Sequence, residues 1–451
     1  MFYLMIVVFI IGYVCIALEG PLRVNKSATA LLLATILWVF LAVGAPTAVP
    51  TLATFQEYLL IHPNETFHAW LSQVALVEHL GSVSEILFFL LGAMTIVEIV
   101  DAHGGFRIIT DKINTRKKTS LLWIITIITF FLSSILDNLT TAIVMVALLR
   151  KLIEDRHDRL FFAGIVILAA NAGGAWTPIG DVTTIMLWIG GKVSTLHIME
   201  TTFIASAISI IIPLAALSFI MKGNINNSEL DATDNSNIKL TNTERNAVFF
   251  MGIGTLLFAP IFKALTHLPP YLAIIAGMGI LWIVTGYMNS KRSEDEINRL
   301  SVGNLLKRID ISSILFFLGI LMAVNALQTG GQLAALSTSL DKIPMNEPGK
   351  YYIITTAIGL LSSVIDNVPL VAGAMGMYSF PMDHYFWAFL AYAAGTGGSI
   401  LIIGSAAGVA VMGMEKIDFI WYLKKISWLA LIGYFAGCIA YIVQNYFTMH
   451  I

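Results

Sequence analysis

Two short stretches of this chain place an acid beside an amide inside otherwise apolar sequence. The stretch SSILDNLTT holds Asp137 next to Asn138, and the stretch SSVIDNVPL holds Asp366 next to Asn367. A charge in the middle of a bilayer costs roughly 2.5 kcal/mol or more, so each acid needs a proton, a cation or a basic side chain as its partner. The recurrence of this pair predicts a site that binds positive charge.

No basic side chain lies near these acids in the sequence. Residues 119–149 and 351–415 contain neither Lys nor Arg. A proton or a hard cation is then the natural partner, because hard cations take oxygen ligands. The alternative is that both acids only cap the half-helices that follow them, since Asp is favoured at the positive N-terminal end of a helix.

Hydroxyl groups surround the two acids unequally. Thr140 and Thr141 follow the first acid, whereas Pro369 and Leu370 stand at the corresponding positions after the second. A Ser or Thr hydroxyl can also simply bond back to its own helix. By residue type, the expected Na+ ligands are Ser134, Asp137, Asn138, Ser363, Asp366 and Asn367.

Two further apolar segments, 160–190 and 384–413, are interrupted by glycines. The first contains NAGGAWTPIGD and the second GTGGSILIIGS, and such sequences unwind a helix and expose backbone carbonyls. Asp181 in the first corresponds to Ser405 in the second, which suggests different roles for the two halves. We expect Asp181 to bind a cation or exchange a proton; the alternative is an acid held only by backbone amides. The residues expected to bind cation or proton are Asp137, Asn138, Thr140, Thr141, Asn171, Thr177, Asp181, Asp366, Asn367, Thr396 and Ser399.

Composition places these residues in a membrane protein. The chain has 451 residues, of which 57% are hydrophobic and 12% charged, against about 25% charged in soluble domains. The net charge of −2 gives no hint of nucleic acid, and the two cysteines offer no disulfide framework or zinc spacing. No cofactor is expected beside the transported ions. The N-terminal run MFYLMIVVFIIGYV predicts a first crossing, not a removable signal. The expected crossings are 2–18, 27–45, 83–101, 160–190, 201–221, 247–262, 271–288, 311–328, 384–413 and 419–446.

Basic residues predict the orientation of these crossings. The loop 102–118 is rich in Lys and Arg, whereas residues 46–82 contain neither. The first is therefore expected in the cytoplasm, the second outside with an amphipathic interfacial piece, and the N-terminus outside. His79, His103, His157 and His197 lie near the expected membrane interfaces, and each is expected to be a surface histidine.

The segments 119–153 and 351–380 each consist of two short apolar halves with polar residues between them. Basic residues flank 119–153 at both ends, so both of its ends are expected on the cytoplasmic side. Irregular backbone at membrane depth is tolerated only inside protein or beside a wet cavity. The pattern predicts two re-entrant hairpins with the acids at their tips.

The two halves of the chain repeat each other. SEILFFLLGAM and SSILFFLGILM match at an offset of 228 residues, SSILDN and SSVIDN at 229, and NAGGAWTPIGD and GTGGSILIIGS at 224. The repeats are expected over 1–221 and 247–451, joined by a polar cytoplasmic linker at 222–246. Five crossings and one hairpin in each half make the repeats inverted, with the C-terminus outside. Inverted repeats with broken helices place a binding site near the midplane.

The motifs SSILDNLTTAIVMVALLRKL, NAGGAWTPIGDVTTIMLWIGGKV and SSVIDNVPLVAGAMGMY resemble those of the NhaD-type sodium/proton antiporter family. This family lies in an ion transporter superfamily that also holds arsenite and dicarboxylate carriers, and the resemblance spans residues 83–415. It implies an all-α fold with two inverted repeats, hairpins with binding tips, and a homodimer built on a scaffold domain. In the dicarboxylate branch the tip resembles Ser-Asn-Thr and binds Na+ beside an anion. Asp137 and Asp366 next to the tip asparagines disfavour an anionic substrate.

These observations predict a secondary active transporter, not an enzyme, that exchanges Na+ or Li+ for H+ by alternating access. Cation and proton are expected to compete for the tip carboxylates. The expected partners are monovalent cations, protons, membrane lipids and a second copy of the chain, in a bacterial inner membrane.

Three alternatives remain at this point. An anion or metalloid carrier of the same superfamily fold is disfavoured by the acidic tips. An intramembrane aspartyl protease would need the motif Gly-x-Gly-Asp before Asp181, where Pro178 stands instead of the first glycine. A channel would conduct without coupled proton movement, and only transport against a gradient separates it from an antiporter.

Overall fold

The protein is helical throughout the part of the chain that its computed structural model describes, residues 2–17, 19–48, 53–110, 115–225, 240–290 and 292–449. This part contains no strand, although an isolated β-bridge pairs Lys117 with Asn224. Seven of its helices are long and apolar enough to cross a membrane, at Lys26–Gly44, Phe67–Ala102, Thr195–Ile220, Asn242–Thr266, Tyr271–Asn289, Ile311–Thr329 and Ser427–Phe447. The protein is therefore a multi-pass membrane protein, which confirms the expectation from composition.

The chain divides into two compact units, and each unit draws on both sequence halves. Unit 1 comprises residues 1–88, 310–350 and 368–381, and unit 2 comprises 89–309, 351–367 and 382–451. Unit 1 contains α1 (Phe2–Ala17), α2 (Glu19–Leu22), α3 (Lys26–Ala48), α4 (Ala53–Ile61), α5 (Phe67–Trp70), the beginning of α6 (Leu76–Ala102), α17 (Ile311–Thr329), α18 (Gln332–Asp341) and most of α20 (Asn367–Met377). Within unit 1, α3 packs against α1 and α17.

Unit 2 holds the acids singled out by the sequence. Its helices in the first half of the chain are the end of α6, α7 (Arg107–Thr110), α8 (Lys118–Ser133), α9 (Asn138–Leu152), α10 (Arg156–Gly174), α11 (Val182–Ile189) and α12 (Thr195–Ile220). Those in the second half are α13 (Asn242–Thr266), α14 (Tyr271–Asn289), α15 (Glu294–Leu300), α16 (Val302–Leu305), α19 (Gly349–Leu361), α21 (Tyr385–Gly397), α22 (Ala406–Glu415), α23 (Phe419–Lys425) and α24 (Ser427–Met449).

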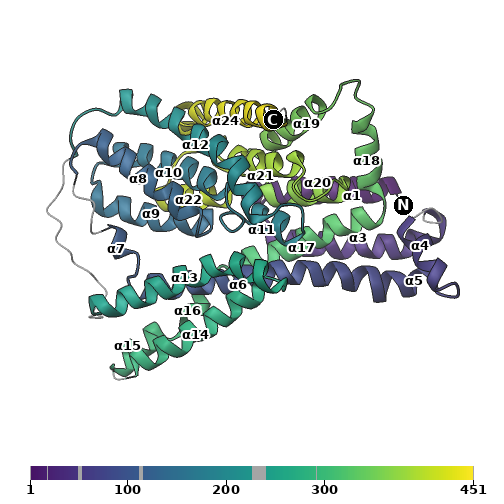
Figure 1. The fold of residues 1–451 in the computed structure, drawn as a ribbon, viewed down its shortest axis with the longest axis horizontal. Coiled ribbons are helices and arrows are strands. Elements are labelled where there is room, and N and C mark those ends of the chain that lie inside the picture. The colour runs from purple at the N-terminus through teal and green to yellow at the C-terminus, as the bar shows by residue number, and fades with distance from the viewer. Residues whose placement is uncertain are drawn as a thin grey trace. The chain divides into compact units, whose positions relative to one another are not determined.

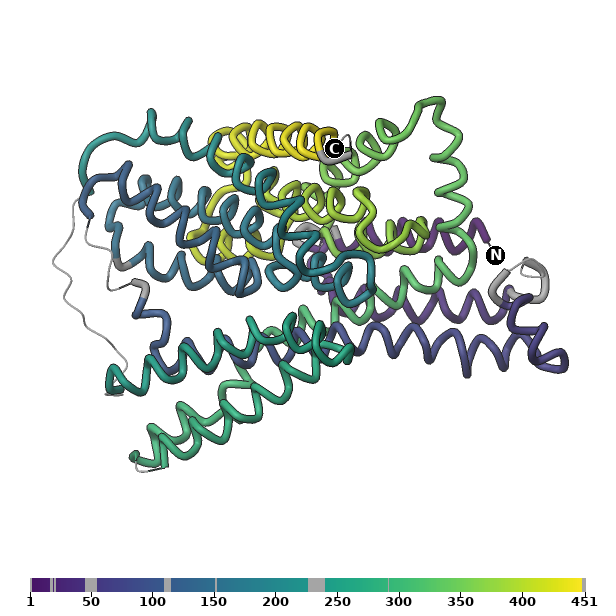
Figure 2. Tube along the Cα trace, viewed as in Figure 1, coloured from purple at the N-terminus to yellow at the C-terminus, as the bar shows by residue number. Residues whose placement is uncertain are grey.

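The helices of unit 2 pack around α10. Helices α8, α9 and α10 lie side by side, and α10 also contacts α12, α21 and α22 (Figure 1). The chain can be followed from α8 through the turn before α9 in Figure 2. Helix α9 packs against α22, and α11 packs against α21, so elements from both sequence halves meet in one core.

The third crossing is longer than the sequence predicts. We expected it to begin at residue 83, but α5, a π-helical turn (Leu71–Ala75) and α6 form one continuous helical span from Phe67 to Ala102. The hydroxyls of Ser72 and Ser82 donate to carbonyls one turn back, at 2.8 and 3.1 Å, so these polar side chains are satisfied within the helix. The expected start at residue 83 is therefore wrong, because the helix already runs through residues 67–82, which we expected in an external loop.

The linker predicted at 222–246 is shorter than expected at its far end. Helix α13 begins at Asn242 and is capped by Thr241, whose hydroxyl accepts from the backbone N–H of Glu244 while the Glu244 carboxylate accepts from Thr241. This reciprocal capping box starts the helix before the apolar run that sequence reasoning used to place it. Residues 226–239 lie outside the described part of the chain.

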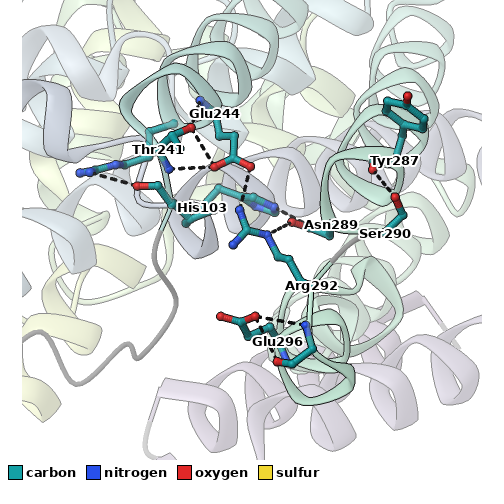
Figure 3. A network of polar contacts seen from close by, with 11 residues as sticks. His103, Thr241, Glu244, Tyr287, Asn289, Ser290, Arg292 and Glu296 are labelled. Carbon is teal, nitrogen blue, oxygen red and sulfur yellow. Dashed lines mark hydrogen bonds and ion pairs between the residues drawn. The ribbon is translucent and has the colours of Figure 1, made fainter.

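A polar network closes the ends of α6, α13 and α14 in unit 2 (Figure 3). His103 lies just beyond α6 with its side chain 0% exposed, so the expected surface position is wrong. Its Nε2 contacts Asn289 Nδ2 at 3.1 Å, and Arg292 bridges from Asn289 Oδ1 at 3.0 Å to Glu244 Oε1 at 2.7 Å. Burial lowers the pKa of His103, the hydrogen bond to the Ile99 carbonyl opposes this effect, and the nearby Arg292 adds to it.

Candidate functional site

The first tip is the turn between α8 and α9. Asp137 caps α9: its Oδ1 accepts from the backbone N–H of Thr140 at 2.8 Å, and its Oδ2 accepts from the Thr140 hydroxyl at 2.6 Å. A carboxylate stabilises the N-terminal end of a helix because it satisfies free N–H groups and opposes the helix dipole. Asp137 is partly exposed, whereas the neighbouring Asn138 is buried. Asp137 therefore has the helix-capping role that was the alternative in the sequence analysis, and it lies next to the buried amide of Asn138.

The break between α10 and α11 places a second acid at a helix N-terminus. Helix α10 ends at Gly174, and Asp181 caps α11. Asp181 Oδ1 accepts from both the backbone N–H and the hydroxyl of Thr183, each at 2.9 Å. The Asp181 side chain is 1% exposed, so these donors and those described next replace water around its charge.

Both tip asparagines donate to this one buried carboxylate. Asn138 Nδ2 lies 2.6 Å from Asp181 Oδ2, and Asn367 Nδ2 lies 3.3 Å from each of the two Asp181 oxygens. Asp137 and Asp366 are also close enough to interact electrostatically with Asp181. Unit 2 therefore brings together the acid–amide pairs of both stretches and the third acid.

Asn171 extends this network to the second broken crossing. Its Oδ1 accepts from Asn138 Nδ2 at 3.0 Å, and its Nδ2 donates to Ser405 Oγ at 3.0 Å. Ser405 caps α22 by accepting from the backbone N–H of Gly408 at 3.1 Å. The N-termini of α9, α11 and α22 are thus joined through side chains.

The remaining candidate hydroxyls are used differently. Thr177 donates to the Ser134 carbonyl at 2.6 Å and so joins the broken crossing to the first tip. Four others donate to carbonyls three or four residues earlier in the chain, at 2.6–2.7 Å: Ser134, Ser363, Thr396 and Ser399. The hydrogen atoms of these four hydroxyls are committed to the backbone, the alternative recognised from the sequence. Thr141 is 0% exposed, and its hydroxyl has no partner among the described residues.

Glycines let each tip approach its broken crossing. A Cβ on Gly180 would lie 2.6 Å from the Ser133 carbonyl oxygen, and one on Gly404 would lie 2.6 Å from the Ser362 carbonyl oxygen. Cβ atoms essentially never come closer than 3.0 Å to another heavy atom. These positions need glycine because backbone meets backbone there.

Two members of the network were missing from the predicted site. Thr183 donates two hydrogen bonds to Asp181, and Ser405 accepts one from Asn171. The signal for Ser405 was present, because the repeat aligns it with Asp181, the acid that caps the corresponding half-helix. The signal for Thr183 was its place two residues after a potential capping acid, where a backbone N–H and a hydroxyl reach the same carboxylate.

Chemically, the site combines three carboxylates, amide groups and the ends of half-helices. Carboxylate and amide oxygens are ligands for hard cations, and a carboxylate can also take up a proton. A second cluster of possible metal ligands, Asp155, His157 and Asp158 at the start of α10, is more exposed. There Asp155 caps the helix through the N–H of Asp158, and Asp158 pairs with Lys118 at 2.6 Å, so structural contacts account for it.

Comparison with known proteins finds one matching family and a set of long relatives. A family model described as citrate transporter matches residues 13–394. Sodium/proton antiporter 1 of Arabidopsis thaliana is 49% identical over 445 residues, 98% of this chain and 72% of the relative. Sodium/proton antiporter 2 of the same plant is 44% identical over 99% of this chain and 100% of the relative. The Na(+)/H(+) antiporter NhaD of Vibrio cholerae is 29% identical over 98% of this chain and 92% of the relative.

Proposed function

The chain belongs to the citrate transporter family, and on that premise we propose that it exchanges Na+ or Li+ for H+ across the membrane. The family is one of transporters, so the protein is a transporter and not an enzyme. Its long relatives with 44–49% identity carry the name sodium/proton antiporter, which supports this exchange over other transported ions.

The convergence of both tips on Asp181 is the observation that carries the proposal. Three acids lie within electrostatic range in the core of a membrane protein, and residues 119–149, 160–191 and 351–415 contain no Lys or Arg. Several negative charges held together without a basic side chain favour the binding of a cation or a proton. The transported cation and the proton then compete for the same oxygens, and each expels the other.

The three acids have different roles in this exchange. Asp137 and Asp366 are the groups at which cation and proton compete. Asp181, held by donors on both oxygens, orients Asn138 and Asn367. Because their Nδ2 atoms face Asp181, we assign their Oδ1 atoms as the cation ligands. The other candidate oxygen ligands, several of them already bonded to backbone, are those of Ser134, Thr140, Thr141, Asn171, Thr177, Ser363, Thr396 and Ser399.

Alternating access completes the mechanism, through two inverted repeats with re-entrant hairpins and broken helices. Equivalent hydrogen bonds in the two halves support the repeats: Ser133 Oγ donates to the Ala170 carbonyl at 2.6 Å, and Ser362 Oγ donates to the Ala394 carbonyl at 2.7 Å. These pairs are separated by the offsets of 229 and 224 residues found in the sequence. Movement of this core between two states would expose the site to one side of the membrane at a time.

A carrier of anions is the second candidate, since the family description names citrate. The same three acids disfavour it, because an anion would meet like charge without a basic residue in the segments that carry the site. The homodimer, the bacterial inner membrane and the external position of both termini stay predictions, and the named relatives come from both a plant and a bacterium.

The test uses everted vesicles or liposomes with an imposed pH gradient that a fluorescent dye reports. Addition of NaCl or LiCl should collapse the gradient, and the variants Asp137→Asn and Asp366→Asn should lose this response. If no cation collapses the gradient, antiport is excluded, and uptake of arsenite or carboxylate anions becomes the next measurement.

A further inference from the structure

We infer that the protein holds a single Na+ per protomer, at the first tip, with Thr141 as a ligand alongside Asp137 and Asn138. This inference rests on the proposed exchange and narrows it, because two repeated tips would otherwise suggest two equivalent cation sites. Three differences between the tips carry it, and each concerns the described residues of unit 2 or the sequence itself.

The first difference is chemical. Thr140 and Thr141 stand on the first turn of α9, whereas the matching positions on α20 are Pro369 and Leu370. Sodium needs several oxygen ligands, and proline and leucine side chains supply none. The second tip therefore has two fewer side-chain oxygens available than the first.

The second difference is an unused oxygen. Thr141 is one turn from Asp137, and its backbone N–H donates to the Asp137 carbonyl at 3.0 Å. Its hydroxyl is fully buried without a protein partner, while every other buried side-chain polar atom in SSILDNLTT and SSVIDNVPL has one. Burial of an unpaired hydroxyl destabilises a fold, so such a group is expected to have a partner in some state of the protein. A cation at the first tip is that partner.

The third difference is how firmly each asparagine is held. Asn138 Nδ2 is bonded at 2.6 Å to Asp181 and at 3.0 Å to Asn171, whereas Asn367 Nδ2 has only the two 3.3 Å contacts to Asp181. The repeat position that matches Asn171 is Gly395, which has no side chain to offer. The Asn138 oxygen is therefore fixed in advance, and preorganised ligands bind more tightly than mobile ones.

The experiment measures Na+ binding to the purified full-length protein. The rise in melting temperature with NaCl, with choline chloride as the ionic-strength control, gives the Na+ dissociation constant, and bound radioactive sodium gives the number of ions per protomer. Thr141→Val removes the hydroxyl at nearly constant volume, Thr141→Ser retains it, and Leu370→Val is the matched change at the second tip.

One Na+ per protomer is expected. Thr141→Val should raise the dissociation constant by about tenfold, which corresponds to about 1.4 kcal/mol. In the absence of Na+ this variant should melt no lower than the unmodified protein does, because an unpaired hydroxyl has been removed. Thr141→Ser keeps the hydroxyl oxygen and should bind Na+ more tightly than Thr141→Val does. Leu370→Val should bind Na+ as the unmodified protein does.

Other results point in two distinct directions. Two Na+ per protomer, an unchanged dissociation constant in Thr141→Val, or an equal loss in Leu370→Val would overturn the single-site inference and leave the proposed exchange standing. No bound sodium and no Na+-dependent rise in melting temperature of the unmodified protein would overturn the proposed exchange itself.

Discussion

Replacement of Gly180 by alanine tests the contact between the first tip and the broken crossing. A Cβ at this position would lie 2.6 Å from the Ser133 carbonyl oxygen and 2.7 Å from Gly174 Cα. Both neighbours are backbone, so no flexible side chain can move aside. The two segments must therefore separate for the methyl group to fit.

The size of that separation follows from the distances. An acceptable contact of 3.0–3.4 Å requires a shift of about 0.4–0.8 Å in a close-packed interior. Overpacking of this kind costs about 1–3 kcal/mol. Gly180 is bonded to Asp181, and the same shift would lengthen the 2.6 Å bond from Asn138 to Asp181 to about 3.0–3.4 Å, at or beyond the usual range.

Thermal unfolding measures the cost of overpacking, and vesicle transport measures the effect of the lengthened bond between Asn138 and Asp181. Gly180→Ala should melt at a lower temperature than the unmodified protein. Addition of NaCl or LiCl should also collapse the pH gradient less in vesicles that contain this variant. Gly404→Ala should behave alike, because its Cβ would lie 2.6 Å from the Ser362 carbonyl oxygen in the matching contact. Gly413→Ala is the control: no atom lies within 4 Å of its Cβ, and alanine in a helix is favoured by about 0.5–1 kcal/mol.

If Gly180→Ala and Gly404→Ala unfold and transport as Gly413→Ala does, the close backbone contacts are wrong. The packing of both tips against their broken crossings would then have to be abandoned. A loss in Gly180→Ala alone would refute only the equivalence of the two halves.

Three further predictions concern buried polar groups. Asp181→Asn should lower the free energy of unfolding by about 2–3 kcal/mol and abolish antiport in the vesicle assay, because an amide nitrogen then faces one of the existing donors. If this variant kept its stability and its antiport, the contacts of Asp181 with the two asparagines would be contradicted. The lowered pKa of His103 means that the unfolded chain binds a proton near the ordinary value of 6.5 while the folded protein does not. The melting temperature should therefore fall as the pH drops below about 6.5, less steeply in His103→Gln, and parallel pH curves would count against this assignment. Glu415 is buried and accepts from Arg150 and Arg159 at 2.6 and 2.8 Å, so Glu415→Gln should reduce stability in thermal unfolding by about 2–4 kcal/mol, and an unchanged melting temperature would mean that these pairs contribute little.

The sequence predicted what depends on local pattern. The acids at Asp137 and Asp366 stood out because a charge is costly inside apolar sequence, and the break before Asp181 stood out because glycine and proline interrupt a helix. The helical fold and the multi-pass membrane class followed from composition and are confirmed.

What failed or was missed depends on contacts between distant segments. The crossing that begins at Phe67 was placed too late, because residues 46–82 were taken as an external loop with an amphipathic interfacial piece, although the hydroxyls of Ser72 and Ser82 are satisfied within the helix. The burial of His103 depends on Asn289, far away in the chain. Sequence reasoning did not predict that Asn138 and Asn367 share the Asp181 carboxylate, because neither the motifs nor the offset between them says which segments meet in the fold.

Sodium accumulation against its own gradient tests the central claim most directly. Purified protein in liposomes with an acidic interior should concentrate radioactive sodium above its external level as protons leave, and a protonophore should abolish the accumulation. Asp137→Asn should accumulate none. Sodium that merely equilibrates regardless of the pH gradient, or accumulation by Asp137→Asn equal to that of the unmodified protein, would contradict exchange at the tip carboxylates.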